Sequence, residues 1–180
     1  EARNRDPYPN HAALAARERE GVDYRVLVAA RPAGIAVIAP HGGGIEPGTS
    51  ELARAIAGDT HAFYAFEGLK REGNSALHVT STRFDEPRAL ALVAAAARVV
   101  ALHGESSDQD LVWIGGLDLE LGGRIGAALR GAGFAVARPE RPELVPRIEA
   151  AIPRYRDRLM VRPGITGLAQ MHLPPDTNLE

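Results

Sequence analysis

The sequence predicts an α/β fold: an open mixed or parallel sheet with helices on both of its faces. Short runs rich in apolar and β-branched residues alternate with segments that have helical character, from Tyr24 to Ala137. This alternation is typical of a largely parallel or mixed sheet that is covered by helices on both sides. The chain has 180 residues, which is enough to bury the core of one domain of ordinary size.

The expected strands are short runs that are bounded by Pro, Gly or polar residues. They cover residues 24–30, 35–39, 61–66, 77–80, 99–103, 111–114 and 134–137. A turn at residues 31–34 predicts that the first two strands are neighbours. His61 and His78 fall inside two of the runs and have no acidic companion nearby, so we interpret both as packing histidines.

The expected helices begin at residues that cap helices well and end at glycine. A short first helix follows Asn10, and the others cover residues 50–56, 87–98 and 119–129. The expected N-caps of the first three are Asn10, Thr49 or Ser50, and Asp85, and the expected stops of the second and fourth are Gly58, Gly131 and Gly133.

Composition excludes several classes of function. The formal net charge of -2 gives no overall attraction to nucleic acid or to anionic membranes. The chain has no cysteine, so disulfides, thiolate metal sites and cysteine nucleophiles are excluded. The longest apolar stretch, from Ala89 to Leu102, is interrupted by Arg98 and is shorter than the ~20 residues of a membrane span. We therefore expect a soluble protein, cytoplasmic or released, with no visible signal peptide and no nucleic-acid or membrane partner.

A change of composition near Arg138 predicts a boundary. Residues 138–147 are charged and rich in proline, and the remainder has only weak amphipathic character. We expect a domain over residues 1–137 and a short helical and irregular C-terminal appendage over residues 138–180.

Two histidines mark the expected functional site. His41 and His103 each follow an apolar run, and ligands in open α/β sheets collect beyond the carboxyl ends of strands. Three glycines separate His41 from Ile45 and Glu46, and their conformational freedom lets the imidazole and the carboxylate face one point. Two histidines and one glutamate, with a fourth position left to water, form a known set of catalytic zinc ligands.

Other interpretations of these residues stay open at this point. A glycine run after a strand also cradles phosphate or simply turns the chain, although a negative charge at Glu46 disfavours phosphate. His103 is equally suited to a hydrogen bond with a backbone carbonyl. Arg83 follows an expected strand on the side of the site, where a guanidinium would hold a substrate carboxylate, or it pairs with Asp85.

The segment Ala39-Pro-His-Gly-Gly-Gly-Ile-Glu-Pro-Gly-Thr-Ser-Glu51 closely resembles the signature of the poly-γ-glutamate hydrolase family of phages and bacteria. The resemblance continues over roughly residues 7–137, through Leu77-His-Val-Thr-Ser, Phe84-Asp-Glu-Pro and Ile114-Gly-Gly-Leu-Asp118. It implies a fold similar to zinc carboxypeptidases, a single zinc at His41, Glu46 and His103, and cleavage of γ-glutamyl amide bonds in an acidic polymer. Arg83 is the expected substrate-binding cation.

The resemblance fails after Ala137, where the family continues with a late strand that resembles Gln-Leu-Glu. Such a strand is the expected source of the general base, so the catalytic base is unknown and the activity is expected to be impaired. Glu120 lies in an earlier helix and is interpreted as a surface residue. Residues 138–180 instead resemble the end of bacterial sugar transferases that load undecaprenyl phosphate, most specifically over residues 152–170. This junction suggests a chimera, and the alternatives are a non-catalytic zinc-binding module or a sugar transferase fragment.

Overall fold

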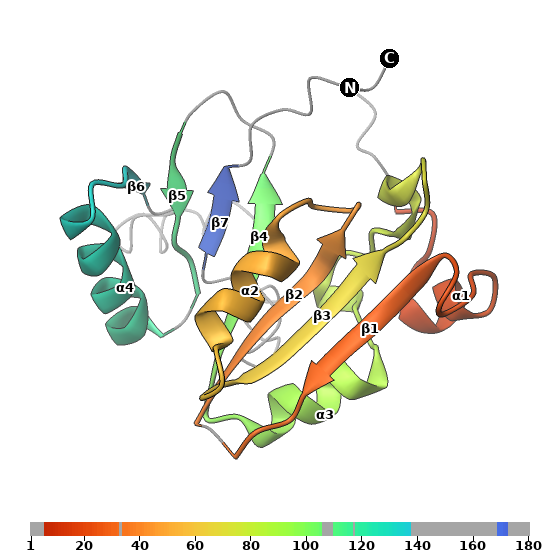
Figure 1. Cartoon of the computed structure of the whole chain (residues 1–180), viewed down its shortest axis with the longest axis horizontal. Coiled ribbons are helices and arrows are strands. Elements are labelled where there is room, and N and C mark those ends of the chain that lie inside the picture. The colour runs from red at the N-terminus through yellow and green to blue at the C-terminus, as the bar shows by residue number, and fades with distance from the viewer. Residues whose placement is uncertain (1–5, 33, 106–109, 117, 138–168, 173–180) are drawn as a thin grey trace, which may run out of the picture.

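The computed structural model describes residues 6–32, 34–105, 110–116 and 118–137, and the backbone of residues 169–172. Within these ranges seven strands form one sheet in the order β1-β3-β2-β4-β7-β5-β6 (Figure 1). The strands are β1 (Tyr24–Ala29), β2 (Ile35–Gly43), β3 (Ala62–Gly68), β4 (Arg98–Glu105), β5 (Val112–Trp113), β6 (Val136–Ala137) and β7 (Ala169–His172). The sheet is mixed, because β2, β3, β4 and β7 are parallel, β1 runs antiparallel to β3, and β5 and β6, which are parallel to each other, run antiparallel to β7.

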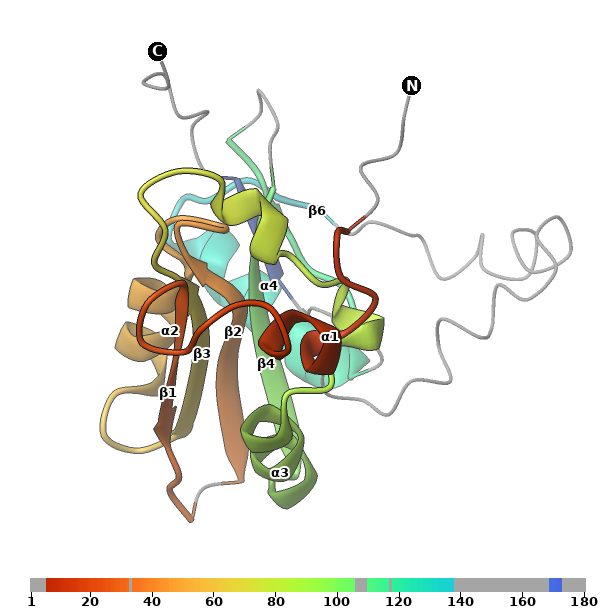
Figure 2. The same cartoon turned by 90° about the vertical axis from the view of Figure 1, so that its right-hand side faces the viewer.

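Helices cover both faces of this sheet, as the sequence predicts. The helices are α1 (His11–Ala15), α2 (Thr49–Ala57), α3 (Pro87–Ala95) and α4 (Leu119–Gly131). Leu14 of α1 and Leu92 of α3 join the core on one face, whereas Ala53 of α2 and Ile125 of α4 pack on the other. Figure 2 shows α1 and α3 on the opposite side of the sheet from α2. The predicted fold class is confirmed.

The predicted pairing of the first two strands is wrong. β1 pairs with β3 along its whole length, from Tyr24↔Gly68 to Ala29↔Phe63, while β2 lies between β3 and β4. The reason is burial. All but the two end residues of β2 are buried, whereas β1 carries exposed residues. A strand that is apolar on both faces belongs in the centre of the sheet, and β1 can form its edge.

Two predicted helix caps are also displaced by one or two residues. The side chain of Asn10 accepts from the backbone N–H of Ala13, as predicted. Glu86 rather than Asp85 caps α3, because the residue before a proline at the first helical position is held extended. Gly48, which has a φ of 88°, precedes α2 in place of a hydroxyl side-chain cap. Gly58 ends α2 as predicted.

Residues 77–80 do not form the predicted strand. Leu77 ends a short 3-10 helix, η1 (Asn74–Leu77), and residues 78–80 link it to a second one, η2 (Ser81–Arg83). The Asn74 side chain bonds both the N–H and the carbonyl of Lys70, which turns the chain before a strand can start. Leu77 and Val79 are fully buried in the core, so the apolar alternation reflects packing without strand pairing.

The predicted boundary at residue 137 falls where the described part of the chain is interrupted, because residues 138–168 and 173–180 lie outside it. β7 is the described piece of the C-terminal segment. It inserts between β4 and β5, with Leu102↔Ala169 and Trp113↔Gln170 among its backbone pairs. The boundary and the appendage stay predictions. No helix among the described residues is long and apolar enough to cross a membrane.

Candidate metal centre

The carboxyl ends of β2 and β4 bring His41 and His103 together at the upper edge of the sheet in Figure 1. The two strands are parallel neighbours, so side chains near their ends project into the same region. Only 2% of His41 and 7% of His103 is exposed. Buried histidines need polar partners, and the Nδ1 atoms of these two lie 3.1 Å apart.

The glycine loop then folds Glu46 back onto the histidines. The N–H of Glu46 donates to the carbonyl of His41 at 2.8 Å, and the N–H of Gly44 donates to the carbonyl of Gly68 at 3.0 Å. Gly43 has a φ of 61°, which side chains other than glycine rarely adopt. The three glycines therefore form a tight turn that returns the carboxylate to the strand end.

We expect Gly43→Ala to disturb this turn. An added Cβ would lie 2.6 Å from the carbonyl oxygen of Gly68, and the positive φ adds strain of about 1–2 kcal/mol for a non-glycine residue. The expected result is a thermal unfolding midpoint that is lowered by several degrees. Gly58→Ala also replaces a glycine of positive φ, but its Cβ would meet open space, so it is the control for backbone strain alone. Equal unfolding midpoints of the two variants would contradict this account of the loop.

Three donor groups converge at the site. Nδ1 of His41 lies 3.0 Å from Oε1 of Glu46, and Nδ1 of His103 lies 3.5 Å from Oε2 of the same carboxylate. Tetrahedral zinc with ligands at about 2.0–2.1 Å separates neighbouring donor atoms by about 3.3 Å. The observed separations of 3.0, 3.1 and 3.5 Å lie near that spacing, with the first and the last measured to different oxygens of the Glu46 carboxylate.

An outer hydrogen bond fixes the position of one hydrogen on His41. Its Nε2 lies 2.8 Å from the carbonyl oxygen of Val79, which can only accept a hydrogen bond, so Nε2 carries the hydrogen. In the neutral ring Nδ1 is then a lone pair that faces the carboxylate of Glu46, itself only an acceptor. Two acceptors at this distance need a cation between them, which is either a metal ion or a second proton that makes the ring an imidazolium. A carbonyl behind a ligating histidine is also the usual outer partner in metal sites.

The carboxylate of Glu46 is held in its charged form. Burial raises its pKa, but hydrogen bonds and charge interactions with His103 and His41 outweigh that effect and lower the pKa to about 2. The N–H of Gly104 also donates to Oε2 at 2.9 Å. The group is therefore an anion at neutral pH, as a metal ligand must be.

His78 lies beside this cluster, contrary to the interpretation as a packing residue of a strand. Its ring centroid is 4.1 Å from that of His41, and single donor atoms of His41, Glu46 and His78 lie within 4.8 Å of one another. Its Nδ1 bonds Oδ1 of Asp6 at 2.7 Å. Gly73 and Asn74, which break regular structure just before it, are the sequence signal against a strand. His61, by contrast, lies away from the cluster at the start of β3.

Arg83 pairs with Asp6 and not with Asp85. Its Nη2 donates to Oδ2 of Asp6 at 2.8 Å and to Oγ1 of Thr80 at 3.2 Å. The side chain is 50% exposed, and both bonds use one nitrogen of the guanidinium. The other guanidinium nitrogens make no hydrogen bond to the described residues. Asp85 instead accepts a hydrogen bond from the backbone of Ala12.

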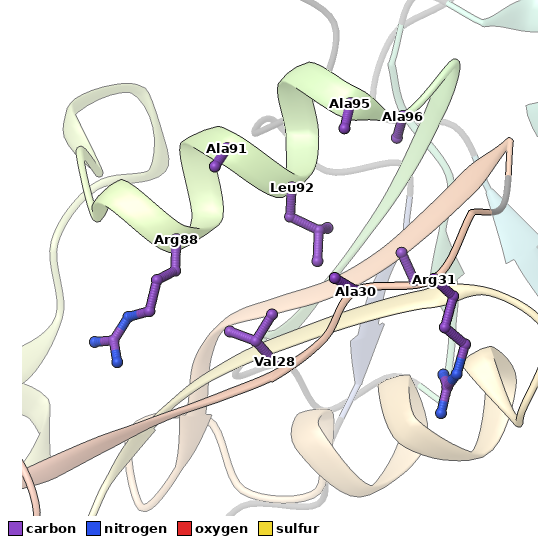
Figure 3. Close-up of a pocket in the computed structure, with 9 residues that line it drawn as sticks. Val28, Ala30, Arg31, Arg88, Ala91, Leu92, Ala95 and Ala96 are labelled. Atoms are coloured by element: carbon purple, nitrogen blue, oxygen red, sulfur yellow. The ribbon is translucent and has the colours of Figure 1, made fainter.

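Two other features do not join the site. Glu120 is 73% exposed on α4 and lies 3.9 Å from Arg98, which agrees with its interpretation as a surface residue. A pocket of about 280 Å³ lies between β1 and α3, where Figure 3 shows Val28 and Leu92 facing each other. Its guanidinium groups, from Arg31 and Arg88, are engaged by the carbonyl of His61 and by the carboxylates of Glu20 and Glu86. Both arginines of the described lining are therefore already paired, and neither is left to bind an anion in the pocket.

Curated relatives share this region of the chain. The SPbeta prophage-derived UPF0714 protein YoqZ of Bacillus subtilis strain 168 is 41% identical over 130 residues, which is 72% of this chain and 47% of the relative. The UPF0714 protein YndL of the same strain is 42% identical over 129 residues, 72% of this chain and 50% of the relative. The chain thus spans about half the length of the curated relatives it matches.

Solved structures agree with this relationship. The structure of a bacteriophage poly-γ-glutamate hydrolase is 38% identical with a TM-score of 0.73, and the match covers 77% of this chain and 68% of the other. The zinc-free apo structure of YndL is 34% identical with a TM-score of 0.77, over 95% and 81%. The family profile described as poly-γ-glutamate hydrolase matches residues 8–152. The chain therefore belongs to the poly-γ-glutamate hydrolase family.

Proposed function

We propose that this chain carries a zinc site that hydrolyses γ-glutamyl amide bonds of poly-γ-glutamate. The observation that carries the proposal is the convergence of Nδ1 of His41, Nδ1 of His103 and the carboxylate of Glu46 within 3.0–3.5 Å. Membership of the family supports the reaction and the polymer. The similar structure of YndL is a zinc-free apo form, which supports zinc as the ion to test.

The residues divide the work of this reaction. His41, Glu46 and His103 would hold the ion, which supplies a polarised carbonyl and a water whose pKa falls to ~7. Hydrolysis would add one water across the amide C–N bond, so that the oxygen ends on the acyl carbon as a carboxylate and the nitrogen leaves as an amine that takes up a proton. Arg83 would hold an α-carboxylate of the polymer through the exposed part of its guanidinium. A chain of net charge -2 needs such a local cation to bind a polyanion.

The first experiment measures zinc per chain in the reconstituted protein and the length of poly-γ-glutamate after incubation at neutral pH. We expect one zinc per chain and shortened polymer. Poly-α-glutamate, which carries the same charge on a different linkage, is the matched control and should keep its length. Zinc without shortening would contradict the hydrolase and favour a non-catalytic zinc module. Absence of zinc would contradict the site itself.

A further inference from the structure

The carboxylate of Asp6, in the N-terminal segment, takes part in four hydrogen bonds. Oδ1 of Asp6 bonds Nδ1 of His78 at 2.7 Å. Oδ2 accepts from the backbone N–H of Thr80 at 2.8 Å, from its hydroxyl at 2.5 Å and from Nη2 of Arg83 at 2.8 Å. The Asp6 side chain is only 9% exposed. All four donors belong to residues 78–83, a segment that no strand pairing holds in place.

This same segment touches the outer nitrogens of both histidine ligands. The carbonyl of Val79 accepts from Nε2 of His41 at 2.8 Å, and Oγ of Ser81 lies 3.5 Å from Nε2 of His103. His78 adds a third imidazole against His41. Outer-shell partners of this kind orient the ligands, and their loss typically costs about 10–100-fold in metal affinity. Whatever holds residues 78–81 therefore also sets the orientation of the ligands.

We propose that Asp6 is a positioning residue of the metal centre, which fixes residues 78–83 so that Val79 and Ser81 orient His41 and His103. The carboxylate also determines the tautomer of His78. Because a carboxylate only accepts, Nδ1 of His78 carries the hydrogen, and its Nε2 is the nitrogen left for the cluster. The proposal rests on the proposed zinc site and extends it to Asp6, which lies 72 positions from His78 in the sequence.

The surroundings of Asp6 support an ionised carboxylate. Burial raises its pKa, while hydrogen bonds from Thr80 and His78 lower it more strongly, to about 2. The interaction is thus charge-assisted at neutral pH, and such hydrogen bonds are shorter and stronger than neutral ones. An amide at this position would keep its size but lose the charge and replace one acceptor by a donor.

The test compares Asp6→Asn with Glu20→Gln in the full chain. Glu20 is the matched control, because it also precedes β1 and binds an arginine in two places, Nη1 and Nη2 of Arg88 at 2.8 and 2.9 Å. Zinc affinity is measured by competition with a chromophoric chelator, and the tautomer of His78 by ¹⁵N NMR of the imidazoles in the zinc-free protein. We expect Asp6→Asn to weaken zinc binding about 10–100-fold and to lose the Nδ1–H signal. Glu20→Gln should change neither.

A zinc affinity for Asp6→Asn within twofold of the unsubstituted chain would overturn the proposal. If that variant does not fold, Thr80→Val replaces it. Valine removes the hydroxyl bond to Asp6 and the longer bond from Arg83 but leaves the other three hydrogen bonds of the carboxylate, so it should give a smaller loss in the same direction. The NMR measurement needs no zinc. If the wild-type chain bound no zinc and still showed His78 with the hydrogen on Nδ1, that result would contradict the proposed function but would agree with the binding of residues 78–83 by Asp6.

Discussion

His41→Ala is expected to abolish both zinc binding and polymer cleavage. The substitution removes one of three donor groups and leaves the carboxylate of Glu46 beside His103 alone. Loss of an outer partner of a ligand typically weakens metal binding by about 10–100-fold. Loss of a ligand itself should weaken zinc binding by more than that. Zinc content after dialysis and the rate of shortening of poly-γ-glutamate measure the two effects.

His61→Ala is the matched control for this variant. His61 precedes β3, and its carbonyl, which receives a hydrogen bond from Arg31, survives the substitution. We expect zinc content and cleavage to stay at the level of the unsubstituted protein. Retention of one zinc by His41→Ala, with cleavage intact, would show that the ion or the active site lies elsewhere.

Phe66→Ala is expected to give a large loss of stability. Phe66 is fully buried in β3, stacks on Tyr24 with ring centroids 4.9 Å apart, and meets the edges of Phe84 and His11 at 5.5 and 5.7 Å. Removing a buried phenylalanine costs about 3–5 kcal/mol of unfolding free energy, because the cavity closes only in part. For a domain of this size the unfolding midpoint should fall by roughly 6–20 °C.

Phe134→Ala provides the control for the chemical change alone. Phe134 follows α4 and is 51% exposed, so its truncation should shift the unfolding free energy by no more than about 0.5 kcal/mol. Urea unfolding of both variants measures the difference. Equal losses in the two would mean that the aromatic cluster around Phe66 does not carry the core.

The candidate ligands could be predicted from the sequence because their signals are local. His41, three glycines and Glu46 stand within six positions, and the positive φ of Gly43 makes the turn that the glycines indicate. His103 ends an apolar run, and parallel strands place such ends at one edge of the sheet. The glycine at position 58 ends its helix for an equally local reason, the freedom of a residue without Cβ.

His78 and Asp6 could not be assigned in this way. The apolar residues on either side of His78 suggest a strand, and only the buried positions of Leu77 and Val79 in the folded core show that packing explains them. Asp6 lies in a polar segment with no motif around it. Its partners are 72 to 77 residues away, and no local pattern reports a contact over that separation.

The sequence by itself determined the class of fold and most of the alternating elements, and it nominated the three candidate ligands, since periodicity, capping and turn chemistry depend on near neighbours. The tertiary structure decided the order of the strands and the outer partners of the site. Placing β2 in the centre and β1 at the edge depends on which surfaces the whole chain can bury. For the same reason, only the folded chain brings Asp6 into contact with residues 78–83, which lie beside His41 and His103.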